Sequence, residues 1–272
     1  MLETRFVTTA DGRRLAYCVG GAADGFPVFS LHGTPGGRLL RRDDIYVPVG
    51  VLGISYDRPG YGQSTRHQGR TVADGAGDIA AIADDLGLTT FAVFGVSGGG
   101  PHALAAAALL QDRVIRCATM VGIAPYGVAS LDYSDRTKGI AALRSAGESA
   151  IEKSMQGFWV GLDAFERGTV SPETSPLVRR LVVDSTRDGL QHGFSGYADD
   201  IIALLGPWGF ELGAVQAPTR ILVMTNDPDA TPAHGRWLAA QIPDARLVIE
   251  EGAHIGVPEP AERELTRWAA HG

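Results

Sequence analysis

Short apolar runs alternate with longer amphipathic stretches along most of the chain. Six runs have the length and composition of buried strands, and they lie at residues 27–31, 51–56, 91–94, 114–123, 220–225 and 246–249. Four stretches have helical spacing, at residues 72–86, 101–110, 234–241 and 260–270. Near the start, residues 5–9 and 13–19 flank Ala10-Asp11-Gly12 and predict a β-hairpin. Together these patterns predict an α/β fold in which helices flank an eight-stranded, mostly parallel sheet.

The segment from residue 128 to residue 213 departs from this alternation. It contains no convincing strand pattern. Its apolar residues recur at helical spacing: Ile151, Met155, Phe158, Trp159 and Leu162, then Leu177 and Leu181, then Tyr197, Ile201, Ile202 and Leu205. We therefore expect a helical cap, or lid, of residues 128–213, inserted after the sixth strand into a core of residues 1–127 and 214–272. Most aromatic side chains of the cap are expected to pack against the core, and the others to line a substrate pocket.

Composition and charge narrow the possible partners. The 272 residues carry a net charge of -7, which opposes binding to nucleic acid or acidic membranes, because phosphate groups are held by clustered Lys and Arg. No apolar run approaches the roughly 18 residues that span a bilayer, and the first residues contain no apolar leader, so a cytoplasmic protein is expected. Cys18 and Cys117 lie in apolar runs and are expected to be buried thiols. The His and Cys spacings match no metal site and no phosphate-binding Gly-Lys-Ser/Thr motif occurs, so we expect no metal, no cofactor and a small-molecule substrate.

The most informative motif is Gly95-Val96-Ser97-Gly98-Gly99, which stands between a strand-like run and an alanine-rich helical run. A serine hydroxyl is a weak nucleophile until it is lifted clear of the backbone and placed beside a general base. Small flanking residues permit the sharp strand-to-helix turn that does this, and Pro101 suits the first turn of the helix. We therefore predict a nucleophile elbow with Ser97 as the nucleophile. The similar run Gly193-Phe194-Ser195-Gly196 lacks a preceding strand and the final glycine, and is expected to be a loop.

An activated serine needs a base, and the base needs an acid that fixes its tautomer. In a parallel sheet these groups come from loops at the carboxyl ends of the strands. The loop after the last predicted strand holds His254, which is the predicted base, whereas His32 is better suited to orient its own loop. The loop after residue 225 holds two candidate acids. Asp229 is preferred, because Asp227 lies only two residues beyond the strand and precedes a proline, and Asp227 is the alternative.

A tetrahedral intermediate also needs two backbone N–H donors aimed at its oxyanion. Gly98, directly after the nucleophile at a helix N-terminus, is predicted to supply one of them. Because Pro35 has no N–H, the second is predicted to come from Thr34 in the loop His32-Gly33-Thr34-Pro35-Gly36-Gly37, with Gly33 as the alternative. A third loop, Asp57-Arg58-Pro59-Gly60-Tyr61-Gly62-Gln63-Ser64, is expected to cross-link itself and to hold this oxyanion loop in place rather than to take part in catalysis.

Taken together, the loops 32–37 and 57–64 and the segment 95–101 resemble the three motifs of the α/β-hydrolase superfamily, more narrowly those of its esterase and proline-iminopeptidase-like members. They occur in the family's order, and Pro207-Trp208-Gly209-Phe210 is similar to the segment where the caps of such proteins rejoin the core. The likeness covers nearly the whole chain. Asn226 stands where the family usually has glycine, and the loop that follows is one residue shorter. The resemblance implies the fold and the arrangement of the site, but not the substrate.

These residues predict a cofactor-free serine hydrolase in which Ser97 attacks an ester or lactone carbonyl, His254 accepts its proton and Asp229 orients His254. The resemblance implies two alternatives, an aminopeptidase or amidase of the proline-iminopeptidase type and a cofactor-free haloperoxidase or perhydrolase. A ligand-binding sensor on the same fold is an alternative of another class. An aminopeptidase needs carboxylates in the cap to hold the substrate's ammonium group. The available acids there are Glu148, Glu152, Asp163, Glu166, Asp199 and Asp200.

Overall fold

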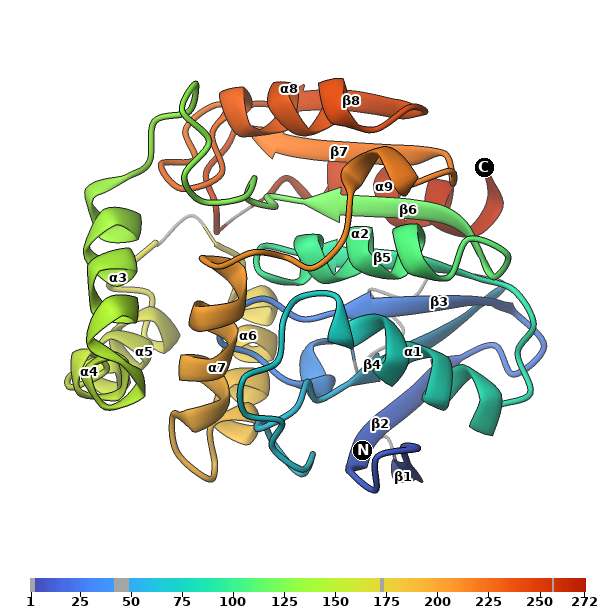
Figure 1. Ribbon diagram of the computed structural model, residues 1–272, viewed down its shortest axis with the longest axis horizontal. Coiled ribbons are helices and arrows are strands. Elements are labelled where there is room, and N and C mark those ends of the chain that lie inside the picture. Colours follow the sequence, from blue (N-terminus) through green and yellow to red (C-terminus); the bar gives the residue numbers. More distant parts are fainter. Residues whose placement is uncertain (1–2, 42–48, 172–173, 256) are drawn as a thin grey trace.

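The computed structural model describes residues 3–41, 49–171, 174–255 and 257–272, and in them an eight-stranded sheet is flanked by helices (Figure 1). The strands are β1 (Thr4–Thr8), β2 (Arg14–Gly21), β3 (Phe26–Leu31), β4 (Val51–Tyr56), β5 (Phe91–Val96), β6 (Val114–Met120), β7 (Thr219–Met224) and β8 (Ala245–Glu250). Their order in the sheet is β1-β2-β4-β3-β5-β6-β7-β8. The pairs β1-β2 and β2-β4 are antiparallel and the other neighbours are parallel. The predicted α/β fold and the predicted strands are confirmed.

The central strands are buried on both faces because helices cover each side of the sheet. Every residue of β5 except the last is buried, which explains why its sequence is continuously apolar rather than alternating. On one face, α1 (Asp74–Asp85), α2 (Gly99–Leu109) and α8 (Pro232–Gln241) pack in a core cluster with side chains from the strands. On the other face, α9 (Glu259–His271) packs against the sheet through Leu265 (Figure 1). These four helices lie within two residues of the predicted bounds.

Between β6 and β7 the described chain is helical, without a strand. We refer to this part, from α3 to α7, as the helical segment. Its helices are α3 (Asp135–Ala146), α4 (Glu148–Ser154), α5 (Phe158–Glu166), α6 (Pro176–Gly189) and α7 (Ser195–Leu204), and the short 3-10 helix η2 (Leu212–Ala214) follows. The arrowheads of β6 and β7 point toward the side of the molecule where the helical segment lies (Figure 1). The helical segment therefore stands at the carboxyl ends of these strands, where a parallel sheet places its functional loops.

The helical segment packs on the rest of the chain through its own apolar cluster. Ile151, Tyr197 and Ile201 are buried there together with Tyr61, which comes from the loop after β4. Gly157, with a φ of 84°, divides the helical pattern of this region into α4 and α5. Tyr197 packs between the two parts as expected, but Phe158, Trp159 and Phe194 contact one another within the helical segment, and Trp159 is exposed. The division of the chain at residues 128 and 213 stays a prediction.

Ser195 does not lie in a loop, contrary to the expectation from its incomplete glycine motif. It is the first residue of α7, and its hydroxyl donates a hydrogen bond to Glu152 Oε1 at 2.9 Å. The helix thus begins two residues before Tyr197, the first apolar position of its repeat. The hydroxyl of Ser195 thus joins α7 to α4.

Candidate active site

Ser97 lies at the sharp turn between β5 and α2. Its φ of 51° is in the left-handed region, which a residue other than glycine adopts only where the surroundings enforce it. The N–H of Ser97 donates to the carbonyl of Met120 at 2.8 Å, and its own carbonyl accepts from the N–H of Gly100 at 2.9 Å. Gly99 lies so close to the end of β3 that a Cβ there would collide with the carbonyl oxygen of Leu31. The predicted strand-to-helix turn at Ser97 is therefore present.

His254 faces Ser97 from the loop that follows β8. Its Nε2 lies 2.9 Å from Ser97 Oγ, which is hydrogen-bond distance although the two residues are 157 positions apart in the chain. The side chain is about one-fifth exposed, with a relative accessible area of 22%. The predicted contact between His254 and the serine is therefore present, and part of the imidazole remains accessible to solvent.

The carboxylate that contacts His254 belongs to Asp227. Asp227 Oδ2 lies 2.7 Å from His254 Nδ1, and Asp227 Oδ1 accepts the backbone N–H groups of Asp229 and Ala230, both at 2.9 Å. Burial favours the neutral acid, but the hydrogen bond and charge of His254 and these two N–H groups hold the pKa of Asp227 below its ordinary value. Asp227 is therefore a fixed, charged acceptor for the Nδ1–H group of His254.

Asp229 has a different neighbour, so the prediction that it orients His254 is wrong. Its Oδ1 accepts the hydroxyl of Ser134 at 2.5 Å, and its Oδ2 pairs with Arg136 at 2.9 Å. The hydroxyl of Ser134 also accepts from the N–H of Thr137 and so caps α3. The physical reason for the difference is the turn itself, because the N–H of Asp229 is tied back to Asp227 while the side chain points to the helical segment.

The oxyanion loop, residues 32–37, lies beside Ser97. A Cβ built on Gly33 would be 3.4 Å from Ser97 Cβ, and one built on Gly98 would collide with Thr34 Oγ1. Thr34 and Gly98 are therefore adjacent to each other and next to the serine. Their predicted role as oxyanion donors stays a prediction that this proximity permits.

An ion-pair network that the sequence did not reveal holds this loop. Arg58 donates to the carbonyl oxygens of His32 and Gly33, the latter at 3.0 Å, and to Thr34 Oγ1 at 3.0 Å. Its guanidinium also pairs with Asp200 of α7 at 2.5 Å, and both side chains are almost completely buried. The expectation that Arg58 holds the oxyanion loop agrees with these contacts.

Asp200 is the centre of the network. It pairs with Arg70 at 2.6 Å and accepts the hydroxyls of Tyr61 at 3.0 Å and Thr34 at 2.8 Å. Burial alone would raise its pKa, but the charges of Arg58 and Arg70 lower the pKa well below the ordinary value. The position of Asp200 on the inner face of the Tyr197-to-Leu205 helical repeat was the signal in the sequence, since a charged residue on such a face requires a buried partner.

A family model for the α/β hydrolase fold matches residues 27–261 of this chain. The chain belongs to the α/β-hydrolase family. Among solved structures, an esterase from Exiguobacterium antarcticum matches this α/β hydrolase with a TM-score of 0.76, at 20% identity over 98% of this chain and 99% of the other. An enol-lactonase from Burkholderia xenovorans LB400 matches with a TM-score of 0.71, at 22% identity over 97% of each chain. At such identities these likenesses show the shared fold.

A curated relative is the non-heme chloroperoxidase of Streptomyces lividans, which is 33% identical over 132 residues. The matched part covers 46% of this α/β hydrolase and 46% of the relative. The chain thus aligns with slightly less than half the length of that curated relative.

Two buried histidines of this α/β hydrolase stabilise the backbone around Ser97. Burial, followed by the charge of Arg58, lowers the pKa of His32 well below its usual range. The same two causes lower the pKa of His102 to about 3. His32 Nδ1 lies 2.7 Å from the carbonyl oxygen of Gly33, and His102 Nδ1 lies 2.9 Å from that of Gly98. A carbonyl only accepts, so each neutral ring carries its proton on Nδ1. His32 orients its own loop, as predicted.

Cys18 and Cys117 are buried free thiols, as expected from their apolar surroundings. In the part of the chain that the structure describes, no three His, Cys, Asp or Glu side chains gather as metal ligands would. Over the same residues, none of the helices combines the length and the apolar character needed to cross a membrane.

Proposed function

We propose that this protein is a serine hydrolase that cleaves ester or lactone bonds of small to medium organic molecules through an acyl-enzyme on Ser97. The observation that carries the proposal is the chain of contacts from Ser97 Oγ to His254 Nε2 at 2.9 Å and from His254 Nδ1 to Asp227 Oδ2 at 2.7 Å. In this order the imidazole can take the proton of the serine hydroxyl, and the buried carboxylate stabilises the imidazolium that results.

In the proposed reaction Ser97 Oγ bonds to the substrate carbonyl carbon as its proton passes to His254 Nε2. Asp227 keeps the other proton of His254 on Nδ1 and stabilises the imidazolium that forms. The backbone N–H groups of Gly98 and Thr34 are the proposed donors to the oxyanion. The C–O bond to the leaving group then breaks, and His254 protonates the departing alkoxide. Water, deprotonated by His254, then attacks the acyl carbon. The bond from Ser97 Oγ to that carbon breaks as His254 returns the proton to Ser97, and the acid leaves.

The experiment is turnover of p-nitrophenyl esters from acetate to octanoate by the wild type, Ser97→Ala, His254→Ala and the control His192→Ala, which removes an exposed histidine. Turnover that is lost in the first two variants and kept in the third is expected. Intact-mass analysis after reaction with a fluorophosphonate should show one adduct in the wild type and none in Ser97→Ala. Equal turnover by Ser97→Ala would overturn the proposal.

A second candidate function, perhydrolysis at the same serine, is favoured by the match to a non-heme chloroperoxidase. Hydrogen peroxide in place of water would attack the acyl-enzyme, so that a peracid leaves and the Ser97 hydroxyl is restored. Peracid formation from an ester and hydrogen peroxide, measured with the wild type and Ser97→Ala, tests this. No peracid from the active wild type would remove this candidate.

An aminopeptidase is disfavoured by the use of the acids in the helical segment. Asp199 pairs with Arg66 at 2.7 Å and Asp200 with Arg58 and Arg70. A carboxylate that already neutralises an arginine has little left to offer to a substrate's ammonium group.

A further inference from the structure

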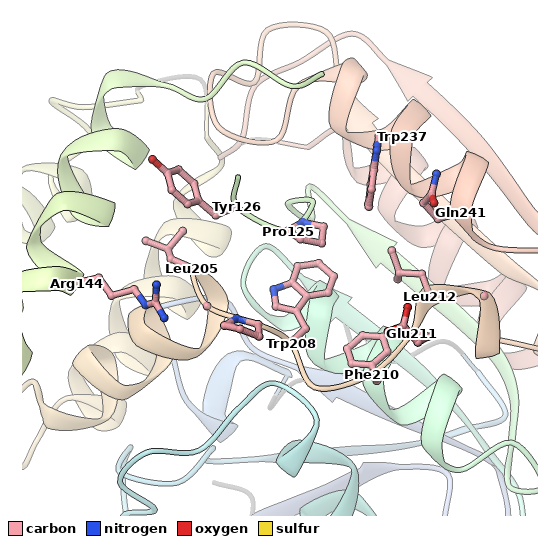
Figure 2. Close-up of a pocket in the computed structure, with 13 residues that line it drawn as sticks. Pro125, Tyr126, Arg144, Leu205, Trp208, Phe210, Glu211, Leu212, Trp237 and Gln241 are labelled. Carbon is pink, nitrogen blue, oxygen red and sulfur yellow. The ribbon is translucent and has the colours of Figure 1, made fainter. Parts of the chain in front are cut away.

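A cavity of about 650 Å³ lies away from the Ser97–His254–Asp227 contacts, and none of those three residues lines it. It lies between the stretch after β6, the connection from α7 to η2, and α8 (Figure 2). We call it the junction pocket, because the helical segment and the sheet meet there. Its volume is in the range of pockets that hold small organic molecules.

Four of the residues that line the junction pocket are aromatic. Tyr126, Trp208, Phe210 and Trp237 line it, and Figure 2 shows Trp208 between the other three. The rings of Trp208 and Phe210 are stacked, with centroids 5.9 Å apart and planes at 19°. Trp208 is also fixed by a hydrogen bond from its Nε1 to the carbonyl of Leu204 at 3.0 Å. A ring that packs on Trp208 and Phe210 meets side chains that already hold each other, so little side-chain entropy is lost there.

Opposite charges stand at two ends of the pocket. Arg144 of α3 lies at one end beside Gly206, and Glu211 lies on the other side of Trp208 (Figure 2). Neither side chain forms an ion pair with another residue of the described chain. A guanidinium offers several N–H donors in a planar fork that matches a carboxylate.

We propose that the junction pocket binds a small aromatic monocarboxylate, with the ring among Trp208, Phe210 and Trp237 and the carboxylate on Arg144. Aromatic contacts supply the ring's affinity, and the guanidinium selects the anion. Glu211 disfavours a second carboxylate at the far end by like-charge repulsion. This inference does not rest on the proposed function, because it uses no residue of the Ser97 site.

The test is titration calorimetry with 3-phenylpropanoate on the Ser97→Ala protein, which keeps the pocket and removes the nucleophile. The matched probes are 3-phenylpropanamide, which lacks the charge, and 3-cyclohexylpropanoate, which lacks the aromatic ring. Adding Arg144→Gln is expected to weaken 3-phenylpropanoate binding by about tenfold to one-hundredfold, the effect of losing a hydrogen bond to a charged group, and to leave amide binding unchanged. The control Lys138→Gln removes another cation of α3 that does not line the pocket, and should change nothing.

Several outcomes would overturn the inference. They are the absence of binding at millimolar probe, equal binding after Arg144→Gln, an equal loss after Lys138→Gln, and equal affinity for the cyclohexyl acid. The wild type labelled at Ser97 with a fluorophosphonate separates the two sites. Binding that survives the label supports the junction pocket, whereas binding blocked by the label assigns the acid to the Ser97 site instead and overturns this proposal alone.

Discussion

The Asp227→Asn substitution keeps the size of the side chain and removes its charge, and the surrounding hydrogen bonds dictate how the amide must sit. Asp227 Oδ1 accepts two backbone N–H groups at 2.9 Å. The amide oxygen must keep that place, because turning the NH₂ group toward two donors would leave buried groups unpaired at about 1–3 kcal/mol each. The NH₂ group therefore faces His254 Nδ1, which was 2.7 Å from the carboxylate.

An NH₂ group can only donate, so His254 Nδ1 becomes an acceptor and the single proton of the neutral ring moves to Nε2. That atom lies 2.9 Å from Ser97 Oγ and can no longer take its proton. The wrong tautomer in a serine hydrolase lowers kcat by about 10⁴, which corresponds to roughly 5 kcal/mol in the activation barrier. We expect a loss of this size in Asp227→Asn, with folding intact.

The assay is kcat for the best p-nitrophenyl ester, with circular dichroism as the check on folding. Asp229→Asn is the matched control, since it changes the neighbouring carboxylate, whose contacts go to Ser134 and Arg136. It should leave kcat nearly unchanged and weaken the attachment of α3. A larger loss of kcat in Asp229→Asn than in Asp227→Asn would refute the reasoning.

Three further predictions concern stability and the oxyanion loop. Burial holds the pKa of His102 at about 3, against an ordinary value of 6.5, so the unfolded chain binds the proton first. The free energy of unfolding should then fall by up to roughly 1.4 kcal/mol for each pH unit below 6.5. Urea unfolding near pH 6.5 and about two units lower should show a smaller loss of unfolding free energy in His102→Gln than in the wild type. Gly196→Ala should lower stability by about 1–3 kcal/mol in thermal unfolding, because a Cβ there would collide with the carbonyl group of Gly60; an unchanged melting temperature would contradict the tight packing of α7. Asp200→Asn leaves Arg58 and Arg70 buried without their shared anion, at a cost of about 3–5 kcal/mol. It should lower kcat as well as stability, and a stable variant with normal kcat would show that the network does not hold the loop.

The sheet was predictable because its information is local. Each central strand is a short apolar run with turn residues on both sides, and burial on both faces requires that pattern. Ser97 was predictable for the same reason, since the turn between β5 and α2 is encoded in five consecutive residues. His254 followed from its place after the last strand.

The sequence near Asp227 and Asp229 does not determine which of the two contacts His254. Both follow β7 closely, and the restriction that Pro228 places on the backbone of Asp227 does not keep its carboxylate from His254. The direction of each side chain decides which acid reaches His254. Two backbone N–H groups hold Asp227 Oδ1, whereas Ser134, the N-cap of α3, holds Asp229. The pairing of Arg58 with Asp200, 142 positions apart, is likewise a product of tertiary packing that spacing in the sequence does not encode.

Asp200 also limits how the helical segment could be exchanged in protein engineering. The segment looks like a module that could be exchanged with that of a relative to change specificity. Yet Asp200 of α7 neutralises Arg58, and Arg58 holds the carbonyl groups of the loop that carries Thr34. A foreign segment without an acid at this position would leave a buried guanidinium unpaired directly beside the nucleophile. A chimera of this protein would therefore need to carry over Asp200 along with the core, even if every other residue of α7 came from the donor.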